Sequence, residues 1–164
     1  MSDSLPRPVR VVAFDVDGTL TDATTWYGGS DIGWCQVYSV RDGEAMLRLG
    51  SRQVIMVPLS RNKTKAARTR MELLGCDLEW LGVSDKPKAF AEICAHYGIP
   101  AEEVLVIGDG PDDAETFALA GVGVAVADAH RTALAAADHV LTSKGGDRAL
   151  EELEAWLEET GRLA

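Results

Sequence analysis

Val9-Arg10-Val11-Val12-Ala13-Phe14-Asp15-Val16-Asp17-Gly18-Thr19-Leu20-Thr21 is the stretch that decides the fold, because an apolar run leads directly into two acids and a glycine. The run Val9–Phe14 is short and β-branched, which predicts a buried strand. Alternate side chains of an extended segment point the same way, so Asp15 and Asp17 can converge on one site. Gly18 permits a sharp turn immediately afterwards. Acids and glycine also occur in plain turns, but two acids this close favour a bound cation or a shared proton.

The rest of the chain alternates apolar runs with amphipathic stretches. Further strands are predicted at Val54–Val57, Val104–Ile107 and Val122–Val126, with weaker candidates at Leu78–Leu81 and His139–Leu141. Helical patterns cover roughly Glu44–Leu49, Lys63–Leu74, Lys86–Tyr97, Ala114–Ala120, Arg131–Ala136 and Arg148–Glu159. This alternation predicts an α/β fold, a Rossmann-like parallel sheet with helices on both faces. The length of 164 residues fits one domain over 1–164.

One segment departs from the alternation. Residues 23–40 read as two extended runs around Gly28-Gly29-Ser30-Asp31, which predicts a β-hairpin inserted after the first strand. A two-stranded hairpin is marginally stable alone. Its aromatic residues are therefore expected to pack on the sheet or on another subunit.

A second acidic motif, Gly108-Asp109-Gly110-Pro111-Asp112-Asp113, follows the predicted strand Val104–Ile107. If the two strand ends lie side by side, several carboxylates meet at one edge of the sheet. Oxygen-only ligands that must also accommodate phosphate suit Mg²⁺. Taken alone, the motif is explained equally well by acidic residues at the start of a helix near Pro111.

Two other strand ends carry groups that complement the acids. Ser60 and Arg61 offer a hydroxyl and a guanidinium, and Lys86 offers an ammonium. Lys86 could equally be an exposed residue in the first turn of a helix. Its place among these motifs favours a role in the site.

Net charge, cysteine spacing and the lengths of the apolar runs indicate which partners and which cellular location to expect. The formal net charge of -10 argues against a nucleic-acid partner, which would require a basic surface. Cys35, Cys76 and Cys94 show no C-x-x-C spacing and are expected to be free thiols in a reducing compartment. The sequence lacks a run long enough for a membrane span and an apolar signal-peptide core. We therefore expect a cytoplasmic protein with no membrane partner.

Read in order, these motifs resemble the four motifs of the haloacid dehalogenase superfamily: Asp15-x-Asp17, a hydroxyl near Ser60, Lys86, and Gly108-Asp109 with Asp113. More narrowly, the chain resembles the 3-deoxy-D-manno-octulosonate 8-phosphate phosphatase subgroup. The stretches that carry this resemblance are Phe14–Asp22, the hairpin followed by Val40–Gly43, Val83–Lys86, Val122–His130 and Ser143–Gly146. The non-catalytic C-terminal domain of some sialic-acid cytidylyltransferases is similar too.

The resemblance implies a core without a large cap domain, and a homotetramer in which the hairpin flaps help to close the active sites. It implies that Asp15 attacks phosphorus, that Asp17 is the acid/base, and that Lys86 neutralises phosphoryl charge. Mg²⁺ would be held by Asp15, the Asp17 carbonyl and Asp109, with Asp113 in its outer shell. The substrate, a small phosphorylated sugar acid, would be contacted by a set of five residues: Arg41, Asp42, Gly43, Ser60 and Arg61.

The chain departs from the family pattern at three places. The expected hydroxyl is displaced to Ser60 behind Pro58, Gly110 replaces a common aspartate, and Glu151 stands where an arginine is usual, with Arg148 one turn earlier. These departures leave two alternatives to the leading hypothesis. One is a catalytically weak or inactive oligomerisation module, and the other is a phosphatase for a different phosphosugar, such as a sialic-acid 9-phosphate.

Overall fold

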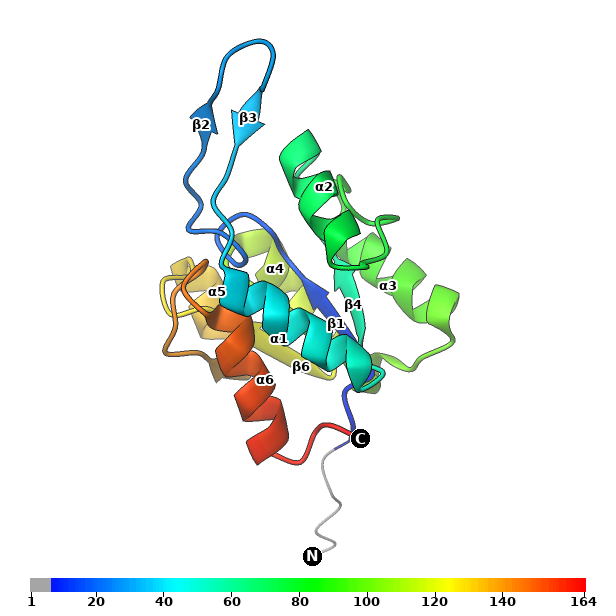
Figure 1. Cartoon of the computed structure of the whole chain (residues 1–164). Coiled ribbons are helices and arrows are strands. Elements are labelled where there is room, and N and C mark those ends of the chain that lie inside the picture. The colour runs from blue at the N-terminus through cyan, green and yellow to red at the C-terminus, as the bar shows by residue number, and fades with distance from the viewer. Residues whose placement is uncertain (1–6) are drawn as a thin grey trace, which may run out of the picture.

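The protein is built on a parallel sheet with helices on both faces. We describe residues 7–164 of a computed structural model (Figure 1). The sheet has five strands in the order β4-β1-β5-β6-β7. The strands span β1 (Val11–Phe14), β4 (Ile55–Pro58), β5 (Val104–Gly108), β6 (Val122–Ala125) and β7 (His139–Val140). All four strand pairings are parallel, which confirms the predicted α/β class.

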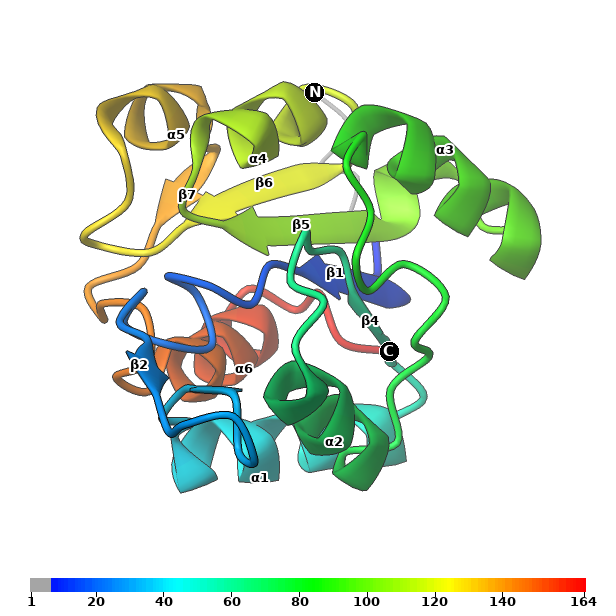
Figure 2. The same cartoon turned by 90° about the horizontal axis from the view of Figure 1, so that it is seen from above.

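Two layers of helices cover the sheet, as the view from above shows (Figure 2). One layer contains α1 (Val40–Ser51), α2 (Lys65–Leu73) and α6 (Ala149–Glu159). The other contains α3 (Lys86–Tyr97), α4 (Pro111–Phe117) and α5 (Arg131–Ala136), and a 3₁₀ turn, η1 (Ala101–Glu103), precedes β5. Every residue of β1 and β5 is buried, as expected for central strands with helices on both faces.

Parallel pairing aligns the ends of the two motif-bearing strands. Phe14 is in register with Ile107 between β1 and β5, and with Pro58 between β1 and β4. Asp15 continues the ladder, since its amide donates to the Ile107 carbonyl at 3.0 Å. The acids that follow β1 and β5 therefore emerge at the same edge of the sheet.

One predicted strand and two predicted helix starts were wrong. Leu78–Leu81 is not a strand, because its only ladder contact is an isolated bridge between Leu81 and Ser60. Helix α4 begins at Pro111 rather than Ala114, since proline is favourable in the first turn of a helix. Helix α1 begins at Val40 rather than Glu44, because the Ser39 hydroxyl accepts the Asp42 amide and caps the helix.

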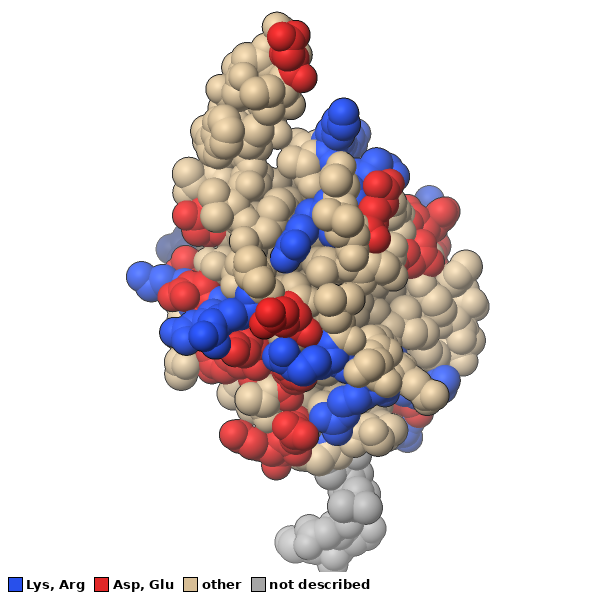
Figure 3. Space-filling model, viewed as in Figure 1, with Lys and Arg blue, Asp and Glu red and all other residues tan. Residues whose placement is uncertain are grey.

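The predicted hairpin is present but shorter than its sequence pattern suggests. Strands β2 (Trp26–Tyr27) and β3 (Trp34–Cys35) pair antiparallel and project from the body of the molecule (Figure 1). Trp26, Tyr27 and Trp34 are each more than half exposed. In the space-filling view the hairpin is almost free of charge up to its tip, where Asp31 is the only charged residue of 24–36 (Figure 3).

Helices α1 and α6 are joined by a row of ion pairs on the surface. Arg41 pairs with Glu151 at 3.1 Å, Arg48 with Glu154 at 2.6 Å, and Arg52 with Glu158 at 3.1 Å. Basic and acidic side chains accordingly alternate over this face (Figure 3). Exposed ion pairs of this kind contribute little individually to the stability of a fold.

Candidate active site

Three carboxylates meet at the carboxyl edge of the sheet. One oxygen from each of Asp15, Asp109 and Asp113 lies within 4.8 Å of the others. Asp15 and Asp113 are buried, with 8% and 1% of their surface exposed. Asp15 follows β1, whereas Asp109 and Asp113 flank the start of α4, so the parallel register of β1 and β5 brings them together.

A buried lysine partly neutralises these acids. Lys86, at the start of α3, is 2% exposed, and its Nζ lies 2.6 Å from Asp113 and 3.1 Å from Asp15. Burial alone would lower the pKa of Lys86, but Asp15 and Asp113 outweigh it and hold the pKa above its usual range. Lys86 is therefore a charged member of the site, and the alternative of an exposed helix residue was wrong.

The acids carry more negative charge than one lysine can balance. Burial raises the pKa of Asp15 to about 7, with Lys86 opposing the shift and Asp109 adding to it. Burial likewise raises the pKa of Asp109, and burial together with Asp15 raises the pKa of Asp113 to about 6. A cation among these oxygens would relieve the repulsion, and an all-oxygen donor set fits a hard divalent ion. The residues present therefore fit the predicted Mg²⁺.

Two glycines allow the acids to approach. Gly18 has φ of +84°, and a Cβ there would lie 2.0 Å from Oδ2 of Asp109. A Cβ at Gly108 would lie 2.2 Å from Cγ of Asp113. A side chain at Gly18 would push the two acidic motifs apart, and one at Gly108 would displace Asp113 within its own motif, which is the physical reason for glycine at both positions.

Asp113 is oriented by the backbone as well as by Lys86. Its Oδ2 accepts the amides of Asp109 and Gly110 at 3.0 and 2.9 Å, while its Oδ1 accepts from Lys86 Nζ. Gly110, where the family pattern commonly has an aspartate, thus supplies a backbone donor. Asp113 in turn fixes the loop that carries Asp109.

Asp17 lies outside the three-acid cluster and is held by two amide side chains. Asn62 Nδ2 lies 3.1 Å from Oδ1 and 3.2 Å from Oδ2 of Asp17, and Gln36 Nε2 also donates to Oδ1. Neither amide was predicted from the sequence. The signal that could have found Asn62 is its position directly after Ser60 and Arg61, at the end of a strand beside β1.

Ser60 and Arg61 take different positions after β4. Ser60 is buried at 1% exposure, and its Oγ accepts the Asn62 amide at 3.2 Å. Arg61 is largely exposed and pairs with Asp112 at 3.3 Å, at the start of α4. Because Asp112 lies 3.6 Å from Lys86 Nζ, Arg61 joins the edge of the charged cluster, while Ser60 organises the loop that presents Asn62.

Three residues predicted to contact the substrate, Arg41, Asp42 and Gly43, lie in the first turn of α1. Asp42 is 2% exposed, and its Oδ1 accepts the amides of Leu150 and Glu151 at the start of α6. Gly43 makes room for Arg70, because a Cβ at Gly43 would lie 2.4 Å from Nη2 of that residue. Arg41 is exposed and engaged with Glu151. The structure therefore places these three at the α1–α6 and α1–α2 contacts, and does not bring them to Asp15.

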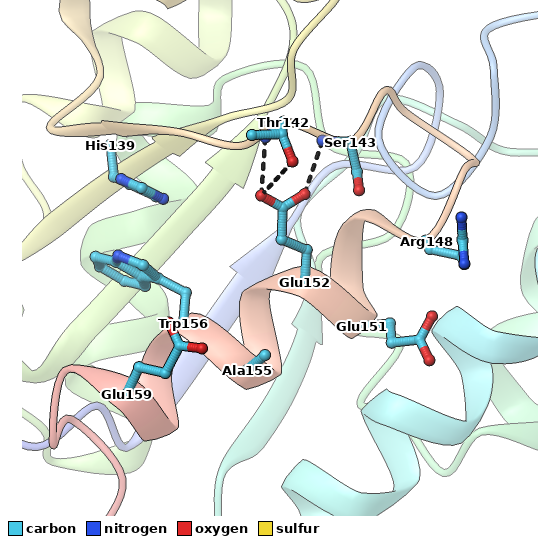
Figure 4. Close-up of a pocket in the computed structure, with 9 residues that line it drawn as sticks. All are labelled: His139, Thr142, Ser143, Arg148, Glu151, Glu152, Ala155, Trp156 and Glu159. Carbon is cyan, nitrogen blue, oxygen red and sulfur yellow. Dashed lines mark hydrogen bonds between the residues drawn. The ribbon is translucent and has the colours of Figure 1, made fainter.

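Residues 145 and 146, near the C-terminus, pack against the loop that follows β1. Gly145 packs on the backbone after Asp17, since a Cβ there would lie 1.9 Å from the Gly18 carbonyl oxygen. The Gly146 amide donates to the Thr19 carbonyl at 2.9 Å. Glu152 anchors this segment by accepting from both Thr142 and Ser143 (Figure 4).

A surface pocket beside this anchor is separate from the chemistry. It lies between α6 and the loop after β7, where His139 stacks on Trp156 with ring centroids 4.5 Å apart (Figure 4). Among residues 7–164, those that line it include none of the acids clustered around Lys86. The candidate site is thus defined by its charged groups rather than by this pocket.

The buried aspartate–lysine constellation on a Rossmann-like sheet is that of a haloacid dehalogenase-like hydrolase. A model of the haloacid dehalogenase-like hydrolase family matches residues 82–148. The chain is 34% identical to 3-deoxy-D-manno-octulosonate 8-phosphate phosphatase of Haemophilus influenzae, over 88% of this chain and 80% of that one. The same enzyme of Yersinia pestis is 32% identical, over 88% and 77% of the two chains.

Solved structures agree with these sequence relationships. The cobalt-bound Haemophilus influenzae phosphatase superposes with a TM-score of 0.88 at 32% identity, covering 96% of this chain and 92% of that one. The 3-deoxy-D-manno-octulosonate 8-phosphate phosphatase of Moraxella catarrhalis, in complex with a magnesium ion, a phosphate ion and a KDO molecule, gives a TM-score of 0.87 at 25% identity, covering 93% of this chain and 87% of that one.

This chain belongs to the haloacid dehalogenase superfamily, in the 3-deoxy-D-manno-octulosonate 8-phosphate phosphatase subgroup, and is a phosphomonoesterase. The relationship favours the enzyme over the non-catalytic module considered from the sequence. No helix within residues 7–164 combines the length and apolarity that a membrane crossing requires.

Proposed function

We propose that the protein is a Mg²⁺-dependent phosphatase that hydrolyses a small phosphorylated sugar acid resembling 3-deoxy-D-manno-octulosonate 8-phosphate. The observation that carries the proposal is the buried Asp15, 3.1 Å from Lys86 and clustered with Asp109 and Asp113. The substrate class rests on the relatives, which are phosphatases of this sugar acid phosphate.

The reaction proceeds in two displacements at phosphorus. A carboxylate oxygen of Asp15 attacks, the bond from phosphorus to the sugar oxygen breaks, and Asp17 donates a proton to that departing oxygen. Asp17 then removes a proton from water, whose oxygen attacks the phosphoryl group on Asp15. Inorganic phosphate leaves, and both aspartates return to their starting states.

Charge neutralisation is the main contribution of the surrounding groups. Lys86 Nζ is placed to contact the phosphoryl oxygens as they approach Asp15. Mg²⁺ would be held by the Asp15 carboxylate, the Asp17 carbonyl and Asp109, with Asp113 in its outer shell. When bound, the ion supplies positive charge to the transferring phosphoryl group.

Recognition of the sugar acid falls to basic and polar groups around the site. Arg61, exposed beside Asp112, is free to swing toward a carboxylate or phosphate, and Ser60 shapes the loop beneath it. Arg41, the remaining cation of the predicted set, could reach a substrate after release from Glu151. Asp42 and Gly43 would act indirectly, by fixing the start of α1.

Assembly and location complete the proposal. The exposed aromatic hairpin is suited to contact a second copy of the chain, so we assign a homotetramer in which hairpins help to cover neighbouring sites. The acidic surface and the absence of paired cysteines in residues 7–164 are in keeping with a cytoplasmic enzyme.

The test is phosphate release from purified protein with Mg²⁺. 3-Deoxy-D-manno-octulosonate 8-phosphate, a sialic-acid 9-phosphate and neutral sugar phosphates would be compared by kcat/KM. We expect the first to be preferred and activity to vanish in excess chelator. Preference for a neutral sugar phosphate would contradict the substrate class, and undiminished turnover in chelator would contradict the metal requirement.

A further inference from the structure

The two amides that hold Asp17 come from separate parts of the chain. Asn62 follows β4, whereas Gln36 follows β3 at the base of the hairpin. Asn62 Nδ2 also donates to Gln36 Oε1 at 2.8 Å, so the two amides bind each other as well as Asp17. The catalytic loop and the hairpin are therefore joined through Asp17.

The backbone determines which way round both amides lie. Asn62 Oδ1 accepts the Thr64 amide at 2.8 Å, and a backbone N–H can only donate. The opposite end of the Asn62 side chain must therefore be its NH₂ group, which faces Asp17 and Gln36. Since Asn62 donates to Gln36, the Gln36 oxygen is the acceptor, and its NH₂ group is left to donate to Asp17.

Tyr38 completes the arrangement at its outer end. Its hydroxyl donates to Gln36 Oε1 at 3.2 Å. Burial, reinforced by Asp17 and opposed by Arg70, raises the pKa of Tyr38 to about 12, so this hydroxyl keeps its proton. With Asn62 and Tyr38 both donating to its oxygen, Gln36 has no alternative orientation that satisfies all three partners.

The contacts on Asp17 are unequal between its oxygens. Oδ1 accepts from both Gln36 and Asn62, while Oδ2 has only the longer contact of 3.2 Å to Asn62. A proton on Oδ1 would meet two donors, so the catalytic proton belongs on Oδ2. Fixing Oδ1 therefore fixes which oxygen presents the proton and in which direction.

We propose that Gln36 and Asn62 are positioning residues for the acid/base step, and that they hold Asp17 through Oδ1 so that Oδ2 carries the proton for the leaving oxygen. This inference rests on the proposed function, in which Asp17 protonates the leaving alkoxide. It adds that the hairpin contributes to the chemistry within its own subunit, through Gln36.

The first arm of the test observes the amides directly, without substrate. The chain contains one asparagine, Asn62, and two glutamines, Gln36 and Gln53. A ¹⁵N–¹H correlation spectrum therefore contains only three side-chain carboxamide groups, with Gln53 as an internal control. Asp17→Ala should move the signals of Gln36 and Asn62 and leave that of Gln53 unchanged. Unmoved signals for both Gln36 and Asn62 would overturn the proposal.

The second arm separates positioning from packing. Protonation matters for an alkyl leaving group and much less for p-nitrophenolate, which departs readily as an anion. Gln36→Met, which keeps size but removes the donor, should lower kcat/KM for an alkyl phosphate about 10-fold or more, and for p-nitrophenyl phosphate by less than about 3-fold. Gln36→Glu, which places a second carboxylate against Asp17, should cost more than Gln36→Met on the alkyl substrate. Equal losses on both substrates, or none, would overturn the proposal.

Asn62 provides a second variant, and the choice of substrate can be judged separately from the role of the amides. Asn62→Leu should show the same difference between the alkyl and p-nitrophenyl substrates as Gln36→Met. Asn62 is buried and braces the turn before α2, so if Asn62→Leu does not fold, Gln36→Met decides alone. An enzyme that cleaves other alkyl phosphates but not the sugar acid phosphate would refute the proposed substrate and leave the leaving-group comparison intact. A wild-type protein without phosphatase activity would refute both proposals.

Discussion

Asp15 is buried against Lys86, so its charge is costly to the fold, and the proposed mechanism uses that charge to attack phosphorus. Asp15→Asn removes the attacking oxygen anion and should lower phosphate release by at least about 1,000-fold, or about 4 kcal/mol of barrier. The melting temperature should stay level or rise, because one of several repelling buried carboxylates is gone. A variant that keeps a tenth of wild-type turnover would contradict the covalent mechanism.

Asp109 is a predicted metal ligand on a loop that is ordered by the side chain of Asp113. Asp109→Ala should weaken Mg²⁺ binding in a calorimetric titration and leave the unfolding transition nearly unchanged, since Asp113 rather than Asp109 makes the hydrogen bonds that order the loop. Asp22→Ala is a matched control, because Asp22 is an exposed acid of the β1 loop outside the cluster. Equal Mg²⁺ affinity in the two variants would refute the assignment.

At the scale of elements, Glu152 is the residue that ties α6 to the loop behind the site. Each of its carboxylate oxygens accepts at least one backbone amide, and a glutamine can supply only one acceptor oxygen. Glu152→Gln should reduce the free energy of unfolding by roughly 1–3 kcal/mol. Turnover should fall too, because Gly145 and Gly146 brace the Asp17 loop.

Glu159→Gln, an exposed change on the same helix, serves as the control for Glu152. It should alter neither stability nor turnover. If both glutamine variants unfold at the same denaturant concentration, the loop does not depend on the Glu152 carboxylate.

The contact between α1 and α6 predicts a pH dependence of stability. Burial raises the pKa of Asp42 to about 6, despite its bonds to the Leu150 and Glu151 amides. The folded state therefore binds this proton more tightly than the unfolded state, whose carboxyl titrates near 3.8. Proton binding by Asp42 therefore stabilises the folded state fully below about pH 4, and this stabilisation is lost as the pH rises through about 6.

Asp42→Asn removes this titration while keeping one oxygen to accept the α6 amides. The free energy of unfolding of the wild type, relative to Asp42→Asn, should fall by roughly 2–3 kcal/mol between pH 4 and pH 7. Denaturant titrations at several pH values measure the difference. A difference that is constant with pH would show that Asp42 titrates normally in the folded protein.

At the scale of the whole molecule, the proposed tetramer would connect assembly to activity through the hairpin. Trp34 is 56% exposed on a two-stranded ribbon that projects from the body, so we expect a neighbouring subunit to cover it. Trp34→Ser should loosen the tetramer and lower turnover together, as measured by light scattering and phosphate release. Leu119→Ser removes an exposed apolar side chain away from the hairpin and should change neither. A fully active monomer at micromolar concentration would refute the tetramer.

The sequence was sufficient for those parts of the fold and site that depend on strand ends. Asp15, Lys86 and Asp109 follow or flank short apolar runs, and parallel register then brings them together. Gln36 and Asn62 were missed because their meeting depends on how the hairpin base and the loop after β4 are folded over Asp17. Asp42 shows the opposite case, since a family motif suggested a substrate contact whereas a helix cap occupies its carboxylate.

The close packing of Gly145 on the Gly18 carbonyl has a consequence for biosynthesis. Residues separated by more than a hundred positions must touch before the Asp17 loop is braced, and β1 itself waits for β5 to be translated before its second edge is paired. At about 5–20 residues per second, the ribosome delivers the segment around Gly145 several seconds or more after Asp15. The nascent chain thus carries Asp15 through most of its synthesis without a finished site around it.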